Sequence, residues 1–443
     1  MSKLFKLAIE GIQDEDLGGV CLSMEELVEN EISIVEDIHE GEQGLADVDR
    51  TLDTADNLSD ISEVIRRIKE PTPTDIALVH TAANMAVAGT DADATSLVPG
   101  TEGFKDMNYA AESIMEKVKG LIKRVVDSIS SLMKKAVSIF AKIKNSLTTY
   151  KFQYTEIIKQ AQEISEETVP SPKFTITSPG KDILLNGKLP TSFAEYAGAF
   201  DQWTKEMSAL DKGANLITDA TTAIITDFVK TKEVNNDQFV TNAYNTLHKA
   251  MTSFVGGLSG AETVPNSDDD GKTYTFKTVY GSNGISVKVP AKVTHSPLSY
   301  DLWGGKDFIE GEKLKGLFKN KVEMTSEGGK EALIKLATKA RDYAIVSIRN
   351  VNDLDKKYGK LAYILDGMQG YQYYEGNTQT TYDTDGNGIT TIYRTISEAT
   401  RVINLTYRLN WRLCFPTLTF FTQVNTTIKK LCNSQLKALH GKA

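Results

Sequence analysis

The fold of this chain depends above all on residues 113–147, which read SIMEKVKGLIKRVVDSISSLMKKAVSIFAKIKNSL. Apolar side chains recur here at gaps of three and four positions, from Ile114 through Val125 and Ile139 to Leu147. This spacing is close to the 3.6-residue period of an α-helix, so one face of the stretch is apolar and the other is polar. The pattern predicts one long amphipathic helix, or two stacked helices, within a helical region at 113–169.

Helical patterns return several times toward the C-terminus. Residues 192–255 carry large apolar side chains at helical spacing, and residues 325–369 do so again. A final helical stretch covers residues 397–439, and we expect Pro416 to interrupt it because proline lacks the backbone N–H that a helix interior needs. These stretches predict a mainly helical domain over residues 170–443.

Two segments of this domain have the alternation of β-strands. Residues 273–289 alternate apolar and polar side chains with a period of two around a glycine-containing turn, which predicts a β-hairpin. A second hairpin is predicted at 371–396. The predicted fold is therefore mainly α with two inserted β-hairpins (α+β), with long amphipathic helices after an acidic, weakly structured N-terminal segment.

The N-terminal segment has a charge of opposite sign to the rest of the chain. Residues 1–100 hold 22 Asp or Glu and 6 Lys or Arg, whereas the rest of the chain holds 37 acids and 44 bases. Phe5 is the only aromatic residue in those first hundred, so we expect helices there but no dense core. A small, polar stretch at about 82–103 has the composition of a linker, which separates an acidic segment over residues 1–112 from the basic helix.

The predicted helix at 113–160 carries an excess of positive charge, with ten Lys or Arg against three acids. One interpretation is a solvated face on an ordinary core helix. Another is a surface that binds a polyanion, either DNA or an anionic membrane. The candidate polyanion-binding residues are Lys117, Lys119, Lys123, Arg124, Lys134, Lys135, Lys142 and Lys144.

Motifs for catalysis or metal binding do not assemble in this sequence. Residues 383–388 resemble the first half of a calcium loop, but Arg394 stands where the twelfth position needs a carboxylate, so a turn is the better interpretation. An enzyme built from dispersed residues such as Asp268, Asp301 and His295 is the weakest alternative. We therefore expect no catalytic residues, no metal ligands, no cofactor and no enzymatic activity.

The cysteine and hydropathy patterns indicate in which cellular compartment the protein is made. The three cysteines are far apart and form no C-x-x-C pair, which is typical of a protein made in a reducing cytoplasm. No run of about 18 to 20 apolar residues occurs, so we expect no transmembrane segment. The apolar stretch at the start of the chain is also too short for the hydrophobic region of a secretory signal peptide.

The junction between the acidic and basic parts offers two candidate cleavage sites of the form small-x-Glu. One comprises Ala110, Ala111, Glu112 and Ser113, with cleavage after Glu112; the alternative comprises Gly100, Thr101, Glu102 and Gly103. Cleavage after Glu112 would separate a segment of net charge −18 from a remainder of net charge +9. This coincidence of a short motif with a switch in charge and periodicity favours a removable acidic segment.

The opening MSKLFKLAIEG, the acidic leader, the small-x-Glu junction and the motif-free remainder together resemble the internal head proteins of giant phiKZ-like tailed bacteriophages. The resemblance implies a virion structural protein, made in the host cytoplasm and packaged inside the capsid. It implies that a propeptide is removed by a prohead protease, with Glu112 as the cleavage residue and Ala110 as its small partner. If the protease follows the Leu/Ile-x-Glu rule of another large phage group, cleavage after Glu29, Glu63 or Glu70 competes.

The implied partners are the prohead protease, capsid or inner-body proteins, and DNA in weak, non-specific contact, with a homo-oligomer left open. Ejection of the mature part into the host is a further open alternative. A membrane-active or secreted effector that uses the basic amphipathic helix remains the competing function.

Overall fold

The computed structural model describes residues 20–87, 107–165, 170–177, 181–230, 236–266, 271–281, 284–291, 301–303, 321–369 and 388–441. Its long α-helices are α2 (Met24–Arg67), α3 (Pro73–Ala86), α5 (Met107–Gln162), α7 (Phe200–Lys230), α8 (Asn236–Gly256), α10 (Gly329–Gln369) and α11 (Gly388–Leu439). Strands contribute only short segments. The prediction of a mainly helical protein with some β-structure is confirmed.

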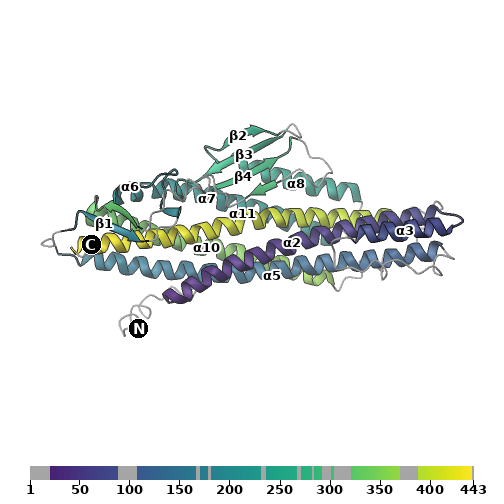
Figure 1. The fold of residues 1–443 in the computed structure, drawn as a ribbon, viewed down its shortest axis with the longest axis horizontal. Coiled ribbons are helices and arrows are strands. Elements are labelled where there is room, and N and C mark those ends of the chain that lie inside the picture. The colour runs from purple at the N-terminus through teal and green to yellow at the C-terminus, as the bar shows by residue number, and fades with distance from the viewer. Residues whose placement is uncertain are drawn as a thin grey trace.

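Four helices, α2, α5, α10 and α11, lie side by side along the long axis of the molecule (Figure 1). Helix α2 runs antiparallel to α5, since the side chain of Asn30 bonds to Ser146 while Ser62 bonds to Ala111 near the opposite ends. Their apolar stripes meet in one large core, in which Phe140 of α5 contacts Tyr358 of α10 and Phe415 of α11. The stripe predicted at 113–147 is therefore the central seam of a helical bundle.

The acidic N-terminal segment is more ordered than its composition indicates. Helix α2 begins with a capping box, in which the Ser23 hydroxyl accepts a hydrogen bond from the Glu26 backbone N–H and the Glu26 carboxylate accepts one from the Ser23 backbone N–H. Leu27, Ile34 and Leu52 are buried in the large core. An acidic helix can fold here because α5 and α11 supply the aromatic side chains that it lacks.

A second, smaller core lies at the far end of the bundle, where the end of α2, the helix α3 and the start of α5 meet. Its members include Leu58, Val79 and Ile114. Helix α3 begins with Pro73 and with a capping box between Thr72 and Asp75. Residues 82–86, which composition assigned to a linker, belong to α3.

The hairpin predicted at 273–289 is confirmed by the antiparallel pairing of β3 (Lys272–Lys277) with β4 (Gly284–Val289). Strands β2 (Glu262–Pro265) and β5 (Asp301–Trp303) extend this pair into a sheet of order β2-β3-β4-β5. A separate two-stranded sheet pairs β1 (Lys173–Thr177) with β6 (Lys321–Thr325).

The second predicted hairpin, at 371–396, is wrong in its last third. Residues 388–396 form the first turns of α11, and residues 371–387, including most of the calcium-like loop, lie outside the described residues. Pro416 also fails to interrupt α11, which continues through it. A proline removes one helical hydrogen bond, but Phe415 directly before it and Trp411 one turn earlier are wholly buried and hold the helix in the bundle.

Aromatic packing joins the sheet to the bundle. The short helix α6 (Phe193–Gly198) supplies Tyr196, whose ring stacks on Tyr280 of the β3–β4 connection at 4.4 Å between centroids. Trp203 of α7 stacks on Phe421 of α11 at 5.3 Å. The aromatic residues of the predicted helical stretch at 192–255 are thus core residues.

Candidate functional site

Helix α2 lies in a groove between α5 and α11 and forms ion pairs with both of these helices. Two glycines bring its backbone close to the groove floor: Gly41 faces the ring of Trp411 on α11, and Gly44 faces Leu132 on α5. Several acidic residues of α2 lie on the two flanks of this buried strip. Each flank meets a different basic helix, so the acidic segment and the basic body are directly paired in space.

The flank that faces α5 pairs with two of its lysines. The ammonium group of Lys142 lies 2.5 Å from a carboxylate oxygen of Asp37 and donates a hydrogen bond to the Ser33 hydroxyl at 2.7 Å. Lys135 pairs with Glu40 and lies 3.8 Å from Asp37. Both lysine side chains are about three-quarters covered, so α2 neutralises the middle of the predicted basic face.

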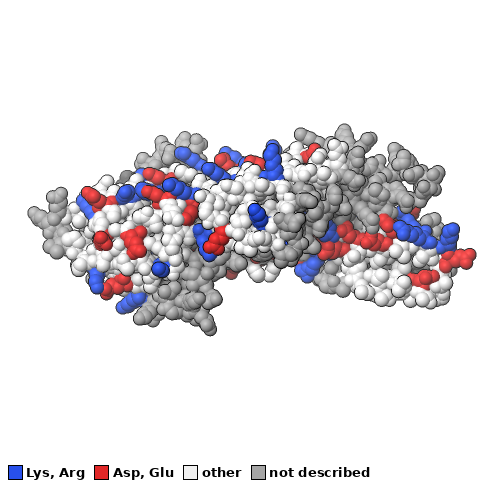
Figure 2. Space-filling view, turned by 90° about the horizontal axis from the view of Figure 1, so that it is seen from above, with Lys and Arg blue, Asp and Glu red and all other residues white. Residues whose placement is uncertain are grey.

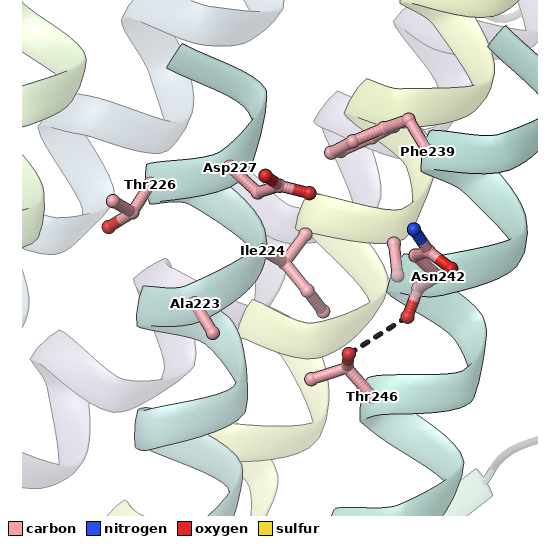
Figure 3. Close-up of a pocket in the computed structure, with 8 residues that line it drawn as sticks. Ala223, Ile224, Thr226, Asp227, Phe239, Asn242 and Thr246 are labelled. Carbon is pink, nitrogen blue, oxygen red and sulfur yellow. Dashed lines mark hydrogen bonds between the residues drawn. The ribbon is translucent and has the colours of Figure 1, made fainter. Parts of the chain in front are cut away.

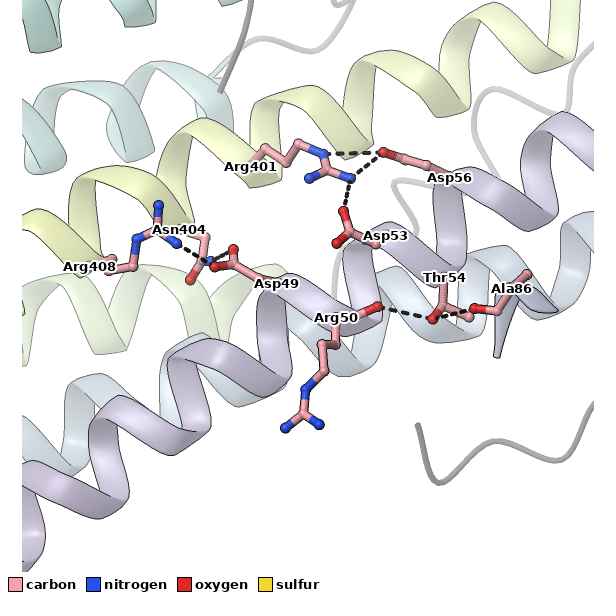
Figure 4. A network of polar contacts seen from close by, with 9 residues as sticks. All are labelled: Asp49, Arg50, Asp53, Thr54, Asp56, Ala86, Arg401, Asn404 and Arg408. Atoms are coloured by element: carbon pink, nitrogen blue, oxygen red, sulfur yellow. Dashed lines mark hydrogen bonds and ion pairs between the residues drawn. The ribbon is translucent and has the colours of Figure 1, made fainter. Parts of the chain in front are cut away.

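The flank that faces α11 pairs with two arginines (Figure 4). Arg401 lies 2.8 Å from Asp53 and 2.5 Å from Asp56, while Arg408 lies 2.5 Å from Asp49. Such charge-assisted contacts between guanidinium and carboxylate groups are among the stronger hydrogen bonds in proteins. The three acids stand at positions i, i+4 and i+7 of α2, which places them on one face of the helix.

The electrostatics of this flank favour the charged state of Arg401. Burial alone would lower the pKa of its guanidinium, but the hydrogen bonds and charges of Asp56 and Asp53 outweigh burial and raise the pKa. Asn404 adds a side-chain hydrogen bond to Asp49 at 2.5 Å. The arrangement is therefore a built ion-pair network rather than a chance surface contact.

A third polar contact joins α2, α5 and α11 at once. The phenol of Tyr150 donates a hydrogen bond to Glu31 at 2.5 Å and lies 2.6 Å from the Thr426 hydroxyl. Burial and the charge of Glu31 raise the pKa of Tyr150 well above its usual value, so the phenol keeps its proton. Because Tyr150 is fully buried, this contact links the three helices within the core.

The structure divides the eight predicted polyanion-binding residues into two groups. Four take part in ion pairs within the protein: Lys119 with Glu116, Lys134 with Asp366, and Lys135 and Lys142 with α2. The other four are Lys144, which lies near Asp355, and the exposed Lys117, Lys123 and Arg124. Figure 2, which views the molecule from above, shows both signs of charge interspersed over the described part of that face.

Sequence reasoning missed Arg401 and Arg408. The available signal was their spacing of seven residues, which places both on one face of α11 and matches the spacing of Asp49 and Asp56 on α2. That match is visible only when the two helices are known to lie side by side.

The first predicted cleavage site lies inside a helix. Ala110 and Ala111 are fully buried in the first turns of α5, and the Ala111 carbonyl accepts a hydrogen bond from the Ser62 hydroxyl at 3.1 Å. Glu112 is exposed and Ser113 is half-buried. Because proteases bind their substrates in extended form, cleavage after Glu112 requires this end of α5 to unwind. The alternative site, Gly100, Thr101, Glu102 and Gly103, lies outside the described residues.

The competing Leu/Ile-x-Glu sites differ in whether the bond to be cut lies in a helix. Glu29 and Glu63 lie within α2. Glu70 is exposed in the non-helical connection between α2 and α3, but Pro71 follows it and would occupy the position after the scissile bond. Proline there lacks an N–H and has a fixed φ angle, which restricts how a protease can hold the bond.

A cavity of about 390 Å³ lies between α7 and α8 (Figure 3). Its lining is Ala223, Ile224, Thr226, Asp227, Phe239, Asn242, Ala243 and Thr246. Asp227 is its only ionisable side chain, so the lining does not offer an acid–base pair. Of the dispersed residues considered for an enzyme, Asp268 and His295 lie outside the described residues, and Asp301 lies in β5.

Among the described residues, no helix is both long enough and apolar enough to cross a membrane. The same residues contain no group of three His, Cys, Asp or Glu side chains placed to hold a metal ion.

The described residues form an elongated helical bundle in which an acidic helix is ion-paired to two neighbouring helices. The sequence model of the phiKZ-like phage internal head proteins matches residues 14–383. The chain therefore belongs to this family, and it is a structural protein located inside the phage head. No curated protein and no solved structure matches it.

Proposed function

We propose that this internal head protein is processed at its N-terminus during head maturation, and that the part left behind contacts packaged DNA. The observation that carries the proposal is the pairing of the acidic helix α2 with basic side chains of α5 and α11. An acidic segment seated on basic helices lowers their attraction for polyanions while the head is still empty of DNA.

Removal of the acidic segment would change the sign of the molecule's charge. Cleavage after Glu112 leaves a remainder of net charge +9, and cleavage after Glu102 lies close to the same boundary. A modest charge of this size supports weak, salt-sensitive and sequence-independent contact with DNA. The domain division that follows is an acidic segment at 1–112, a basic helical region at 113–169 and a mainly helical domain at 170–443.

The partners in this proposal are the prohead protease, other capsid or inner-body proteins, and DNA. Ejection of the mature part into the host and assembly into a homo-oligomer are later steps that the proposal permits. The proposal assigns the protein no enzymatic activity.

The membrane-active alternative loses the feature on which it depended. The apolar stripe of α5, including Ile139, Ile143 and Leu147, is wholly buried against the other helices of the bundle. A helix binds the membrane interface through an exposed apolar face, and in this fold α5 presents none at these positions.

Peptide mapping of purified phage particles tests the proposal. We expect peptides from the C-terminal part in the head and a new N-terminus at Gly103 or Ser113. A new N-terminus at Pro71 would select the Leu/Ile-x-Glu rule instead. Intact Met1 in mature particles would exclude processing.

A further inference from the structure

The groove that holds α2 has basic side chains on both rims. Lys135 and Lys142 of α5 lie along one rim, and Arg401 and Arg408 of α11 lie along the other. Their acidic partners extend from Asp37 to Asp56 on α2, a span of roughly 28 Å at 1.5 Å per helical residue. The two lysines lie beside residues 37–40 of α2 and the two arginines beside residues 49–56, so the four cations follow successive stretches of the helix on opposite flanks.

These cations are covered by α2 but remain near solvent. The exposed fractions of their side chains are 25% for Lys135, 28% for Lys142, 19% for Arg401 and 27% for Arg408. Each contact thus lies at the edge of the α2 seat rather than in its apolar floor. A charged group from outside can reach this edge if the carboxylate of α2 is absent.

The chemistry of the rims fits a phosphate ligand. Guanidinium and ammonium groups that pair with carboxylates pair equally well with phosphate oxygens, and arginine presents a planar fork suited to both. Duplex DNA carries about one negative charge per 1.7 Å of axis, so each cation along this span of roughly 28 Å can meet a phosphate. The carboxylates of α2 occupy positions that backbone phosphates could occupy.

We propose that the rims formed by Lys135, Lys142, Arg401 and Arg408 are a binding site for the phosphate backbone of duplex DNA, and that α2 occupies this site as an intramolecular competitor. The assignment rests on the proposed DNA contact and names its site, including two arginines outside the predicted basic helix. It also means that cleavage of the chain does not by itself open the site. Helix α2 stays held by its apolar contacts and ion pairs until it is displaced.

The test compares two triple variants of the whole protein that lose the same three charges. In D49N/D53N/D56N the carboxylates that pair with Arg401 and Arg408 become amides. In the control E25Q/E29Q/E36Q, three exposed acids of α2 are neutralised instead. Binding to a fluorescent 30-base-pair duplex of mixed sequence is measured by polarisation across a salt series.

We expect D49N/D53N/D56N to bind this DNA about tenfold more tightly than the control near 0.1 M salt. The logarithmic salt dependence should steepen by about 2, because two more phosphate contacts form. Addition of R401Q and R408Q to the same variant should abolish the gain. An equal gain in the control, or a gain that survives loss of the arginines, would show a mere net-charge effect and overturn the proposal.

A second variant keeps the test valid if the triple variant does not fold. D37N/E40Q removes the acidic partners of Lys135 and Lys142 on the opposite rim. Addition of K135Q and K142Q to this variant should abolish its gain in DNA binding. If either freed rim binds polyglutamate tightly but not DNA, the site recognises an acidic protein helix and the DNA assignment is wrong. Peptide mapping of virions tests the processing separately. Intact Met1 in mature particles would exclude processing but would not change the DNA-binding result. If D49N/D53N/D56N shows no gain in DNA binding, only the assignment of this DNA site is wrong.

Discussion

Gly41 offers the sharpest test of how α2 is seated. A Cβ atom at this position would lie 1.9 Å from one ring carbon of Trp411 and 2.4 Å from another. Trp411 is wholly buried, and its ring packs 4.4 Å from that of Phe415 and 5.8 Å from that of Tyr407. The indole therefore has no free space into which it can move, and in Gly41→Ala the helix α2 itself must lift.

The magnitude follows from two opposing effects. Alanine in a helix interior is favoured over glycine by about 1 kcal/mol, because glycine loses more backbone entropy on folding. Overpacking of a dense core costs typically about 1 to 3 kcal/mol, and more where neighbours cannot relax. For a contact as short as this one we expect a net loss of about 2 kcal/mol in the stability of the α2 seat.

Hydrogen exchange measured by mass spectrometry is the appropriate assay, because it reports the opening of α2 separately from the rest of the chain. A loss of 2 kcal/mol corresponds to about 30-fold faster exchange of the central amides of α2. Gly359→Ala is the matched control: it lies in a helix with nothing within 4 Å of its added Cβ, so it should slow exchange or leave it unchanged. Unchanged protection of α2 in Gly41→Ala would refute the close approach to Trp411.

Three further predictions concern buried groups. Burial raises the pKa of Asp211 from 3.8 to about 6, and a hydrogen bond from Asn350 partly opposes this rise. Between these two pKa values the folded state keeps a proton that the unfolded state loses, so the stability of the protein should fall as the pH rises from about 4 to 6. Asp211→Asn should remove up to about 3 kcal/mol of this dependence, measured by urea denaturation at several pH values; an identical pH profile in the variant would contradict it. Tyr154→Phe deletes a buried hydroxyl that bonds to the Asn425 carbonyl and side chain, both at 3.0 Å, and should cost about 1 to 2 kcal/mol, seen as a lower denaturation midpoint. Burial raises the thiol pKa of all three cysteines, but Cys414 and Cys432 are enclosed whereas Cys21 is partly exposed, so iodoacetamide should modify Cys21 first in the native protein; equal rates at all three would be inconsistent with this core.

The acidic helix illustrates how composition and packing can point in different directions. With no Phe, Tyr or Trp of its own, α2 could not form a core alone, and its many acids would repel one another in isolation. In the bundle its leucines and isoleucines pack on α5 and α11, and its acids pair with the basic residues of those helices. Stability of the acidic segment thus depends on the basic part from which we propose it is cut.

The sequence by itself determined the helical class, the long apolar stripe at 113–147, the hairpin at 273–289 and the separation of charge between the two parts of the chain. These features depend on local periodicity and composition. Both can be recognised within a few turns of one helix or within one pair of strands. The family resemblance likewise rested on the order of short segments, and it is confirmed by the match over residues 14–383.

Only the tertiary structure decided which residues meet. Arg401 lies 345 positions from Asp56 in the chain, and no local pattern of either helix reveals that they touch. The same holds for the buried state of Ala110 and Ala111, which depends on α2 and α3 packing over the start of α5. Partners of this kind follow from how amphipathic faces pair in space, and that choice is made by the packing of the whole core.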